Sequence, residues 1–162
     1  MKVGFENEKK FRVASGPVSD LVNGAEITQG YLWFWPVVRV RFKDFWDSLL
    51  TIKIKIVPGV NLELEPKISL SLARWLMKHH KYHKVRKIRY KIGRLEIDVF
   101  LGELAGLVLI EFEKKHLNET AEIPVGFVVE EVTGDERFSN HNLCQLDKIP
   151  EEWRCQDVPR SV

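Results

Sequence analysis

The chain has 162 residues, a length that suits one domain with a substantial hydrophobic core. Apolar residues make up 44% and charged residues 30%, which excludes a disordered chain, and a net charge of only +2 disfavours broad nucleic-acid binding. The apolar runs are far shorter than the ~20 residues that span a bilayer, and the N-terminus lacks the apolar run of a signal peptide. We therefore expect a cytoplasmic protein, without nucleic-acid or membrane partners, in which Cys144 and Cys155 are reduced.

The first part of the chain is predicted to form β-strands. β-branched and aromatic residues dominate runs that are interrupted at Pro36, around Asp44 and at Pro58-Gly59, and residues 15–24 are rich in turn formers. The predicted strands are residues 2–13, 25–35, 37–43, 49–57 and 61–65.

A helix is predicted next, from Pro66 to about His80, with one face packed on the outside of the sheet. The residues at helical spacing are Ile68, Leu72, Trp75, Leu76 and His79. Three further strands are expected at 84–92, 94–101 and 106–114, separated by a turn at Gly93 and a loop at Gly102. A short strand at 128–133, a short helix at 136–146 and an irregular tail complete the chain. We expect one domain at residues 1–150, followed by a tail at 151–162.

Charges of one sign recur at every second position along most of these predicted strands. Residues two apart share one face of a strand, and the positions between them are largely apolar. A solvated sheet face is the simplest explanation for any single pair, but such faces usually mix signs. The basic groups are Arg39 with Arg41, Lys53 with Lys55, and Lys87 with Arg89; the acidic groups are Glu6 with Glu8, Glu63 with Glu65, Glu96 with Asp98, and Glu111 with Glu113. A divalent cation on the acidic strands and an oligophosphate on the basic strands would neutralise these charges.

The predicted fold class is α+β: an eight-stranded antiparallel β-barrel with flanking helices. Eight strands can close into a barrel just wide enough for a small ligand, and the short connections favour antiparallel order. The charged face would then line a tunnel, and helices or a second subunit, in a homodimer, would cover the apolar outer face.

The ordered motifs resemble the CYTH domain, or triphosphate tunnel metalloenzyme family, over about residues 2–146. They are Glu6-x-Glu8-x-Lys10, Ile27-Thr-Gln29-Gly30-Tyr31-Leu32, Val38-Arg39-Val40-Arg41, Leu50-Thr-Ile-Lys53, Glu63-Leu-Glu65, Lys87-Ile-Arg89-Tyr90, Glu96-Ile-Asp98-Val-Phe100-Leu-Gly102, Gly106-Leu-Val-Leu-Ile-Glu111-Phe-Glu113 and Glu131-Val-Thr133-Gly-Asp135 with Arg137-Phe-Ser-Asn140. The sequence departs from the family at Asn61, Leu95 and Phe138, where Arg, Trp and Tyr are frequent. The resemblance implies a tunnel that binds triphosphates with a divalent metal ion, and short members of this type look like tripolyphosphatases.

The resemblance also implies roles for individual residues. Mg²⁺ or Mn²⁺, which prefer oxygen ligands, would be bound by the acidic residues Glu6, Glu8, Glu111 and Glu113. The phosphates would be held by Lys10, Arg39, Arg41, Lys53, Lys87 and Arg89, which together with Asp98 are the expected catalytic residues. The alternative is that these residues form salt bridges with one another. Three roles stay open for Glu63 and Glu65: pairing with arginine, binding a second metal ion, or orienting water. Glu131 is expected to pair with a basic residue or to close the tunnel end.

Metal-dependent hydrolysis of inorganic tripolyphosphate is therefore the predicted function. The alternatives are an adenylyl cyclase, a thiamine triphosphatase and a polyphosphate-binding module without turnover. His79 and His83 have helical spacing, but the lysines around them favour a solvated helix end over a metal site.

Overall fold

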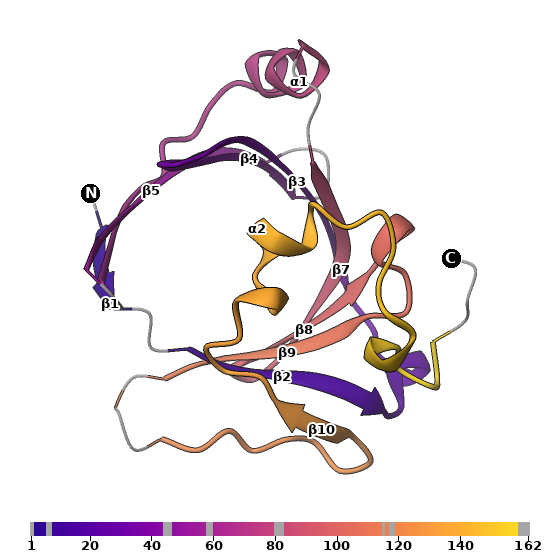
Figure 1. Cartoon of the computed structure of the whole chain (residues 1–162). Helices are drawn as coiled ribbons and strands as arrows, with labels where there is room; N and C mark the ends of the chain where they lie inside the picture. The colour runs from indigo at the N-terminus through magenta and orange to yellow at the C-terminus, as the bar shows by residue number, and fades with distance from the viewer. Residues whose placement is uncertain are drawn as a thin grey trace.

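The computed structural model describes residues 2–5, 8–43, 47–57, 60–79, 83–114, 116 and 119–158, and the side chains at 2–5, 55–57 and 60–61 are not described. Its main feature is one antiparallel sheet of ten strands that curves around an interior (Figure 1). The strands are β1 (Lys2–Phe5), β2 (Glu8–Ser15), β3 (Ala25–Phe34), β4 (Val37–Lys43), β5 (Asp47–Val57), β6 (Val60–Leu64), β7 (Lys84–Ile92), β8 (Leu95–Phe100), β9 (Val108–Glu113) and β10 (Val128–Glu131).

The strand order is β1-β6-β5-β4-β3-β7-β8-β9-β2-β10. The count exceeds the predicted eight because the N-terminal strand is described in two parts, β1 and β2, and because β10 pairs with the outer side of β2. β1 pairs with β6 while β2 pairs with β9, so the N-terminal segment contacts strands near both ends of the order. No pairing joins the two ends within the described residues, so the closed barrel stays a prediction.

The outer face of β2, β8 and β9 is apolar and covered. Phe11, Ile97, Ile110 and their neighbours are buried beneath Leu21, Phe127 and other residues of the connecting segments. Strand alternation therefore sends Lys10, Asp98 and Glu111 to the inner face. This arrangement confirms the predicted sorting of apolar and charged residues onto opposite faces of these strands.

The inner face is apolar at one end of the curved sheet. There Tyr31, Val85 and Phe100 pack against Phe138 and Trp153, which come from the C-terminal part of the chain. Figure 1 shows α2 (Asn140–Leu143) inside the curve of the sheet, after the 3₁₀ turn η3 (Glu136–Phe138) and before η4 (Glu151–Trp153). Residues 151–158 pack on the sheet without forming a strand or an α-helix, since Trp153 and Cys155 are buried.

Helix α1 (Leu70–His79) lies outside the sheet, over β4 and β5 (Figure 1). The predicted buried face of this helix was wrong: Leu72 and Trp75 are 45% and 54% exposed, whereas Ala73 is fully buried. Ala73 faces the sheet, and Leu70 and Met77 of the helix line a common pocket with Phe42 of β4. No helix in the described ranges is long and apolar enough to cross a membrane.

Candidate functional site

Two half-buried arginines on the inner face of β4 have unsatisfied donors. The Nε–H groups of Arg39 and Arg41 are buried without a hydrogen-bond partner among the described residues. Arg39 lies 4.0 Å from Glu65, at the limit of an ion pair, and Arg41 makes no ion pair in the described part of the chain. Burial, the charge of Arg39 and the charge of Arg89 lower the pKa of Arg41 to about 10. Buried donors of this kind need an acceptor, and an anion between the strands would provide one.

The next basic strand, β5, carries a lysine that pairs with a carboxylate of β6. Lys53 of β5 lies 3.6 Å from Glu63 of β6, its direct neighbour in the register. The hydroxyl of Thr51, which is opposite Arg39, donates a hydrogen bond to Glu65 at 3.0 Å. The structure therefore supports the pairing alternative for Glu63 and Glu65, although both ion pairs are long.

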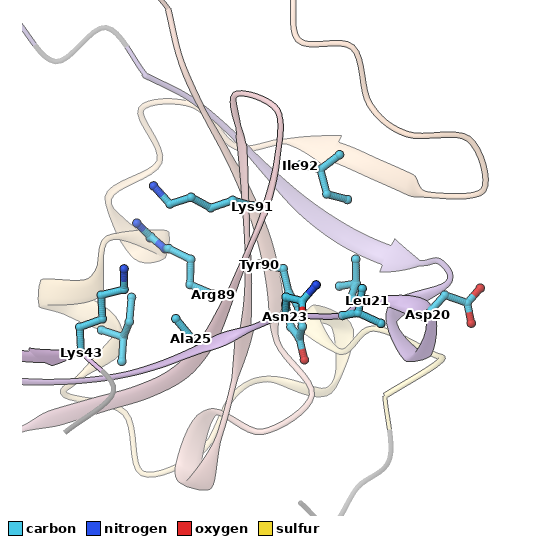
Figure 2. A pocket seen from close by; sticks show the side chains of 11 residues that line it. Asp20, Leu21, Asn23, Ala25, Lys43, Arg89, Tyr90, Lys91 and Ile92 are labelled. Carbon is cyan, nitrogen blue, oxygen red and sulfur yellow. The ribbon is translucent and has the colours of Figure 1, made fainter. Parts of the chain in front are cut away.

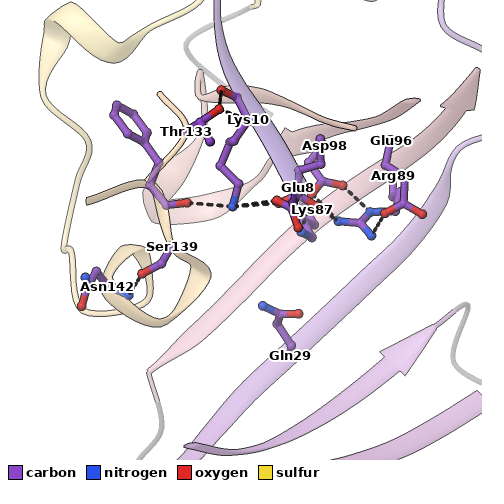
Figure 3. A network of polar contacts seen from close by, with 12 residues as sticks. Glu8, Lys10, Gln29, Lys87, Arg89, Glu96, Asp98, Thr133, Ser139 and Asn142 are labelled. Carbon is purple, nitrogen blue, oxygen red and sulfur yellow. Dashed lines mark hydrogen bonds and ion pairs between the residues drawn. The ribbon is translucent and has the colours of Figure 1, made fainter. Parts of the chain in front are cut away.

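The cations of β7 are tightly paired, in contrast to those of β4. Lys87 and Asp98 are both fully buried and form an ion pair, and Arg89 binds both oxygens of Asp98 at 2.6 Å (Figure 3). Arg89 also contacts Glu96 and lies 2.7 Å from Glu111. Although burial opposes it, these carboxylates raise the pKa of Arg89, whereas burial outweighs the charge of Asp98 and lowers the pKa of Lys87. Asp98 thus fixes the positions of two cations.

Lys10 of β2 connects the acidic residues to the C-terminal segment. Its Nζ lies 3.1 Å from Glu111 and 3.3 Å from Glu8, and it donates to the carbonyl of Phe138 at 3.5 Å (Figure 3). Burial would lower the pKa of Lys10, but Glu111 and Glu8 raise it above its usual value. The backbone N–H of Lys10 donates to the hydroxyl of Thr133, which anchors the same segment.

The carboxylates near Lys10 are crowded. Glu8 lies directly opposite Glu113 in the β2–β9 register, and Glu111 lies directly opposite Glu96 in the β8–β9 register. Directly opposed like charges destabilise a sheet. Burial and the charge of Glu111 raise the pKa of Glu8, whereas Lys87, Lys10 and Arg89 outweigh burial and lower the pKa of Glu111 to about 2. A divalent cation bound between these carboxylates would reduce their mutual repulsion.

The described residues alone do not form a complete metal site. No group of three or more His, Cys, Asp or Glu side chains in the described part of the chain is arranged to hold a metal ion. Of the predicted ligands, Glu8, Glu111 and Glu113 lie on β2 and β9, while Glu6 lies outside the described residues. The oxygen donors that are present suit Mg²⁺ or Mn²⁺.

The described histidines near the end of α1 form no metal site, and Glu131 forms a salt bridge. His79 is exposed and contacts the ring of Trp75, and His83 contacts Phe34, while His80 lies outside the described residues. Glu131 pairs with Lys9 at 3.2 Å, which confirms the predicted pairing with a basic residue.

Two polar residues of the interior were not predicted as site residues. Gln29 and Tyr31 are buried on β3, and Gln29 donates a hydrogen bond to the Tyr31 hydroxyl at 3.0 Å. Tyr31 lies directly opposite Arg39 in the β3–β4 register. The sequence shows that Gln29 and Tyr31 are two residues apart and therefore share one face of the strand. The predicted site was selected by charge, and neither side chain carries one, so both were missed.

Comparison with known proteins identifies similar chains. This chain is 35% identical over 147 residues to an inorganic triphosphatase of Acetivibrio thermocellus, a match that covers 87% of this chain and 94% of that protein. It is 32% identical over 149 residues to an inorganic triphosphatase of Nitrosomonas europaea, covering 85% and 95% of the two chains. A solved crystal structure of an inorganic triphosphatase matches with a TM-score of 0.64 and 30% identity, over 90% of this chain and 99% of that one. No protein-family model matches the chain.

Proposed function

The chain belongs to the inorganic triphosphatase family, and on this premise we propose that it hydrolyses inorganic tripolyphosphate with the help of a divalent metal ion. The observation that carries the proposal is the pair of buried, unsatisfied Nε–H donors of Arg39 and Arg41 on β4, because a buried donor without an acceptor is costly unless an anion binds it. The ordered motifs that resemble the CYTH domain support the same assignment. The curved sheet would act as the tunnel in which the substrate binds.

In this proposal the basic residues divide into two sets. Arg39 and Arg41, whose Nε–H donors are unsatisfied, bind the phosphates directly together with Lys53; the guanidinium groups supply planar forks and the lysine a compact charge. Lys10, Lys87 and Arg89 are held in position by carboxylates on the opposite wall, from which they would contact the phosphates. Asp98 acts as a positioning residue, because it holds Lys87 and Arg89 through direct contacts.

Glu8, Glu111 and Glu113, with Glu6 as a further expected ligand, would hold Mg²⁺ or Mn²⁺. When bound there, such an ion would supply positive charge to the phosphate oxygens and the transferred phosphoryl group. The arginines and Lys53 keep the phosphate chain in line with an attacking water, and a carboxylate of this wall orients that water. Water adds across one P–O–P bridge, so that orthophosphate and pyrophosphate are the products and no covalent enzyme intermediate is required.

The test is a comparison of tripolyphosphate, ATP and thiamine triphosphate, each with Mg²⁺ or Mn²⁺, with orthophosphate, pyrophosphate and cyclic AMP followed together. The proposal predicts orthophosphate release that is greatest from tripolyphosphate. Formation of cyclic AMP would instead support the cyclase, and faster turnover of thiamine triphosphate would support that substrate. Binding of all three without products would support the binding module.

A further inference from the structure

One side chain inside the curve of the sheet has a buried acceptor without a donor. Oδ1 of Asn140, the first residue of α2, is buried and has no hydrogen-bond partner among the described residues. The other buried side-chain atoms in this condition in the described part of the chain are the Nε–H donors of Arg39 and Arg41. Each such atom in a folded protein calls for an explanation. An anion between the strands supplies one for the arginine donors, but an anion cannot satisfy an acceptor.

The segment that carries Asn140 bridges the two charged walls, and Figure 1 shows α2 inside the curve of the sheet. Two residues before Asn140, the carbonyl of Phe138 accepts a hydrogen bond from Nζ of Lys10, on the side of the carboxylates (Figure 3). One residue after it, the ring centroid of His141 lies 6.0 Å from that of Tyr31, on the strand beside the arginines of β4. Asn140 therefore lies along the chain between a contact with one wall and a contact beside the other.

Other groups than the Asn140 amide hold α2 in place. Oγ of Ser139 accepts a hydrogen bond from the backbone N–H of Asn142 at 3.2 Å, and the side-chain amide of Asn142 donates to the carbonyl of Glu136 at 2.7 Å. Leu143 is fully buried in the apolar cluster at this end of the sheet. The helix is thus capped and anchored by its neighbours, and the amide oxygen of Asn140 is held in position without a structural task of its own.

The other end of the inner face is hollow. A cavity of about 410 Å³ lies where β3 begins and where β4 and β7 end, and Arg89 is among the residues that line it (Figure 2). The end near α2 is instead filled by apolar side chains, which include Phe100 and Leu143. A phosphate chain that enters from the cavity and binds Arg39 and Arg41 therefore presents its leading phosphate toward α2.

We propose that Oδ1 of Asn140 accepts a hydrogen bond from the water that attacks the substrate, which makes Asn140 a further catalytic residue. The inference rests on the proposed function. The phosphate oxygens of tripolyphosphate are acceptors and repel an amide oxygen, whereas water is a donor. With one hydrogen directed to Asn140 and the other to a carboxylate of the acidic wall, a lone pair of the water oxygen is aimed at the phosphorus.

The step balances with water and substrate alone. The water oxygen bonds to the terminal phosphorus, and the bridging P–O bond breaks with its electron pair on the leaving pyrophosphate. One proton of the water passes to the carboxylate, and the other stays on the orthophosphate product. Asn140 takes up no proton, because a neutral amide is a very weak base, so its contribution is the orientation of the water.

The experiment measures kcat, KM for tripolyphosphate and the melting temperature of the wild type, Asn140→Leu and Asn140→Asp. Leucine has nearly the shape of asparagine but no acceptor, so kcat should fall about 10- to 100-fold in Asn140→Leu, whereas KM should stay close to the wild-type value. Its melting temperature should equal or exceed that of the wild type, because the free protein loses no hydrogen bond. Asn140→Asp keeps the acceptor and should recover most of the lost kcat, while its added charge near the phosphates raises KM.

Asn142→Leu is the matched control in the same helix. It removes a hydrogen bond that is made, so it should lower the melting temperature, and it should leave kcat unchanged because Ser139 and Leu143 still hold α2.

Three results would overturn the inference while wild-type turnover of tripolyphosphate upholds the proposed function. A raised KM with unchanged kcat in Asn140→Leu would show that the amide binds the substrate. A lowered melting temperature with unchanged kcat would show a structural role. An equal loss of kcat in Asn140→Leu and Asn140→Asp would show that the acceptor is not the cause. A wild type without tripolyphosphate turnover would instead contradict the proposed function and this inference together.

Discussion

At the scale of single residues, Arg41 shows how binding capacity and stability oppose each other. Its Nε–H is buried and unsatisfied, and desolvation of the half-buried side chain is the main cause that lowers its pKa to about 10. Arg41→Met keeps much of the volume and removes the charge. We expect the melting temperature of the free protein to rise by about 2–4 °C, the shift that about 1 kcal/mol produces in a chain of this size.

The same substitution should weaken tripolyphosphate binding about tenfold or more, the usual cost of losing a hydrogen bond to a charged group. Differential scanning calorimetry and isothermal titration calorimetry measure the two effects. Arg74→Met, at an exposed position of α1, is the control and should change neither. A variant that is less stable and binds as tightly as the wild type would show that Arg41 has a structural role instead.

Glu111 should make the free energy of unfolding depend on pH in the acidic range. Its pKa is lowered to about 2 in the folded protein, because the charges of Lys87, Lys10 and Arg89 outweigh burial. The unfolded chain takes up the proton first as the pH falls below about 4.3, the usual value for glutamate, so the stabilisation is lost between there and about pH 2.

Urea unfolding at pH 6, 4 and 3 measures this loss. Glu111→Gln cannot titrate at this position, so its stability should decline less steeply over that range than that of the wild type. Glu103→Gln, at an exposed position, should keep the wild-type slope. Parallel pH curves for the wild type and Glu111→Gln would contradict the account of this network.

At the scale of elements, the strands were more predictable than the helices. The predicted strands at 37–43 and 84–92 agree with β4 and β7, and Gly93, with φ of +57°, makes the expected turn after β7. The predicted helix at 136–146 is instead a 3₁₀ turn followed by the four-residue α2. Asp135 accepts a hydrogen bond from the Arg137 N–H and Ser139 accepts one from the Asn142 N–H, so two caps in close succession interrupt the helix.

The C-terminal segment beyond residue 150 should be required for a stable fold. Trp153 is buried, and its ring centroid lies 4.5 Å from that of Phe138 in the apolar cluster that fills one end of the sheet. We expect Trp153→Ala to lower the free energy of unfolding by about 3–5 kcal/mol, the range for large core residues. Val125→Ala, at a 98% exposed position, should have no measurable effect. A Trp153→Ala variant as stable as the wild type would contradict this account of the C-terminal segment and favour the boundary predicted at residue 150.

At the scale of the whole molecule, the sequence predicted the oppositely charged walls but not which of the cations are paired with carboxylates. The period of two placed Arg39, Arg41, Lys87 and Arg89 on a common face. Which cations are already neutralised depends on cross-strand register and burial, since Asp98 lies directly opposite Arg89 while Arg41 lies opposite Leu49. Both pairings join consecutive strands, but the partners depend on the exact register, and a shift of one residue would exchange them. The division into paired and unpaired cations therefore required the structure.

The central claim is that the carboxylate-rich wall and the arginine-rich wall together hydrolyse tripolyphosphate with a divalent ion. The most direct measurement is ³¹P NMR of tripolyphosphate incubated with wild-type protein or Glu8→Gln, in Mg²⁺ or in EDTA. We predict equal amounts of orthophosphate and pyrophosphate in Mg²⁺, none in EDTA, and a rate about 100-fold lower for Glu8→Gln, equivalent to about 3 kcal/mol. Equal turnover in EDTA, or a folded Glu8→Gln protein with the wild-type rate, would contradict the account.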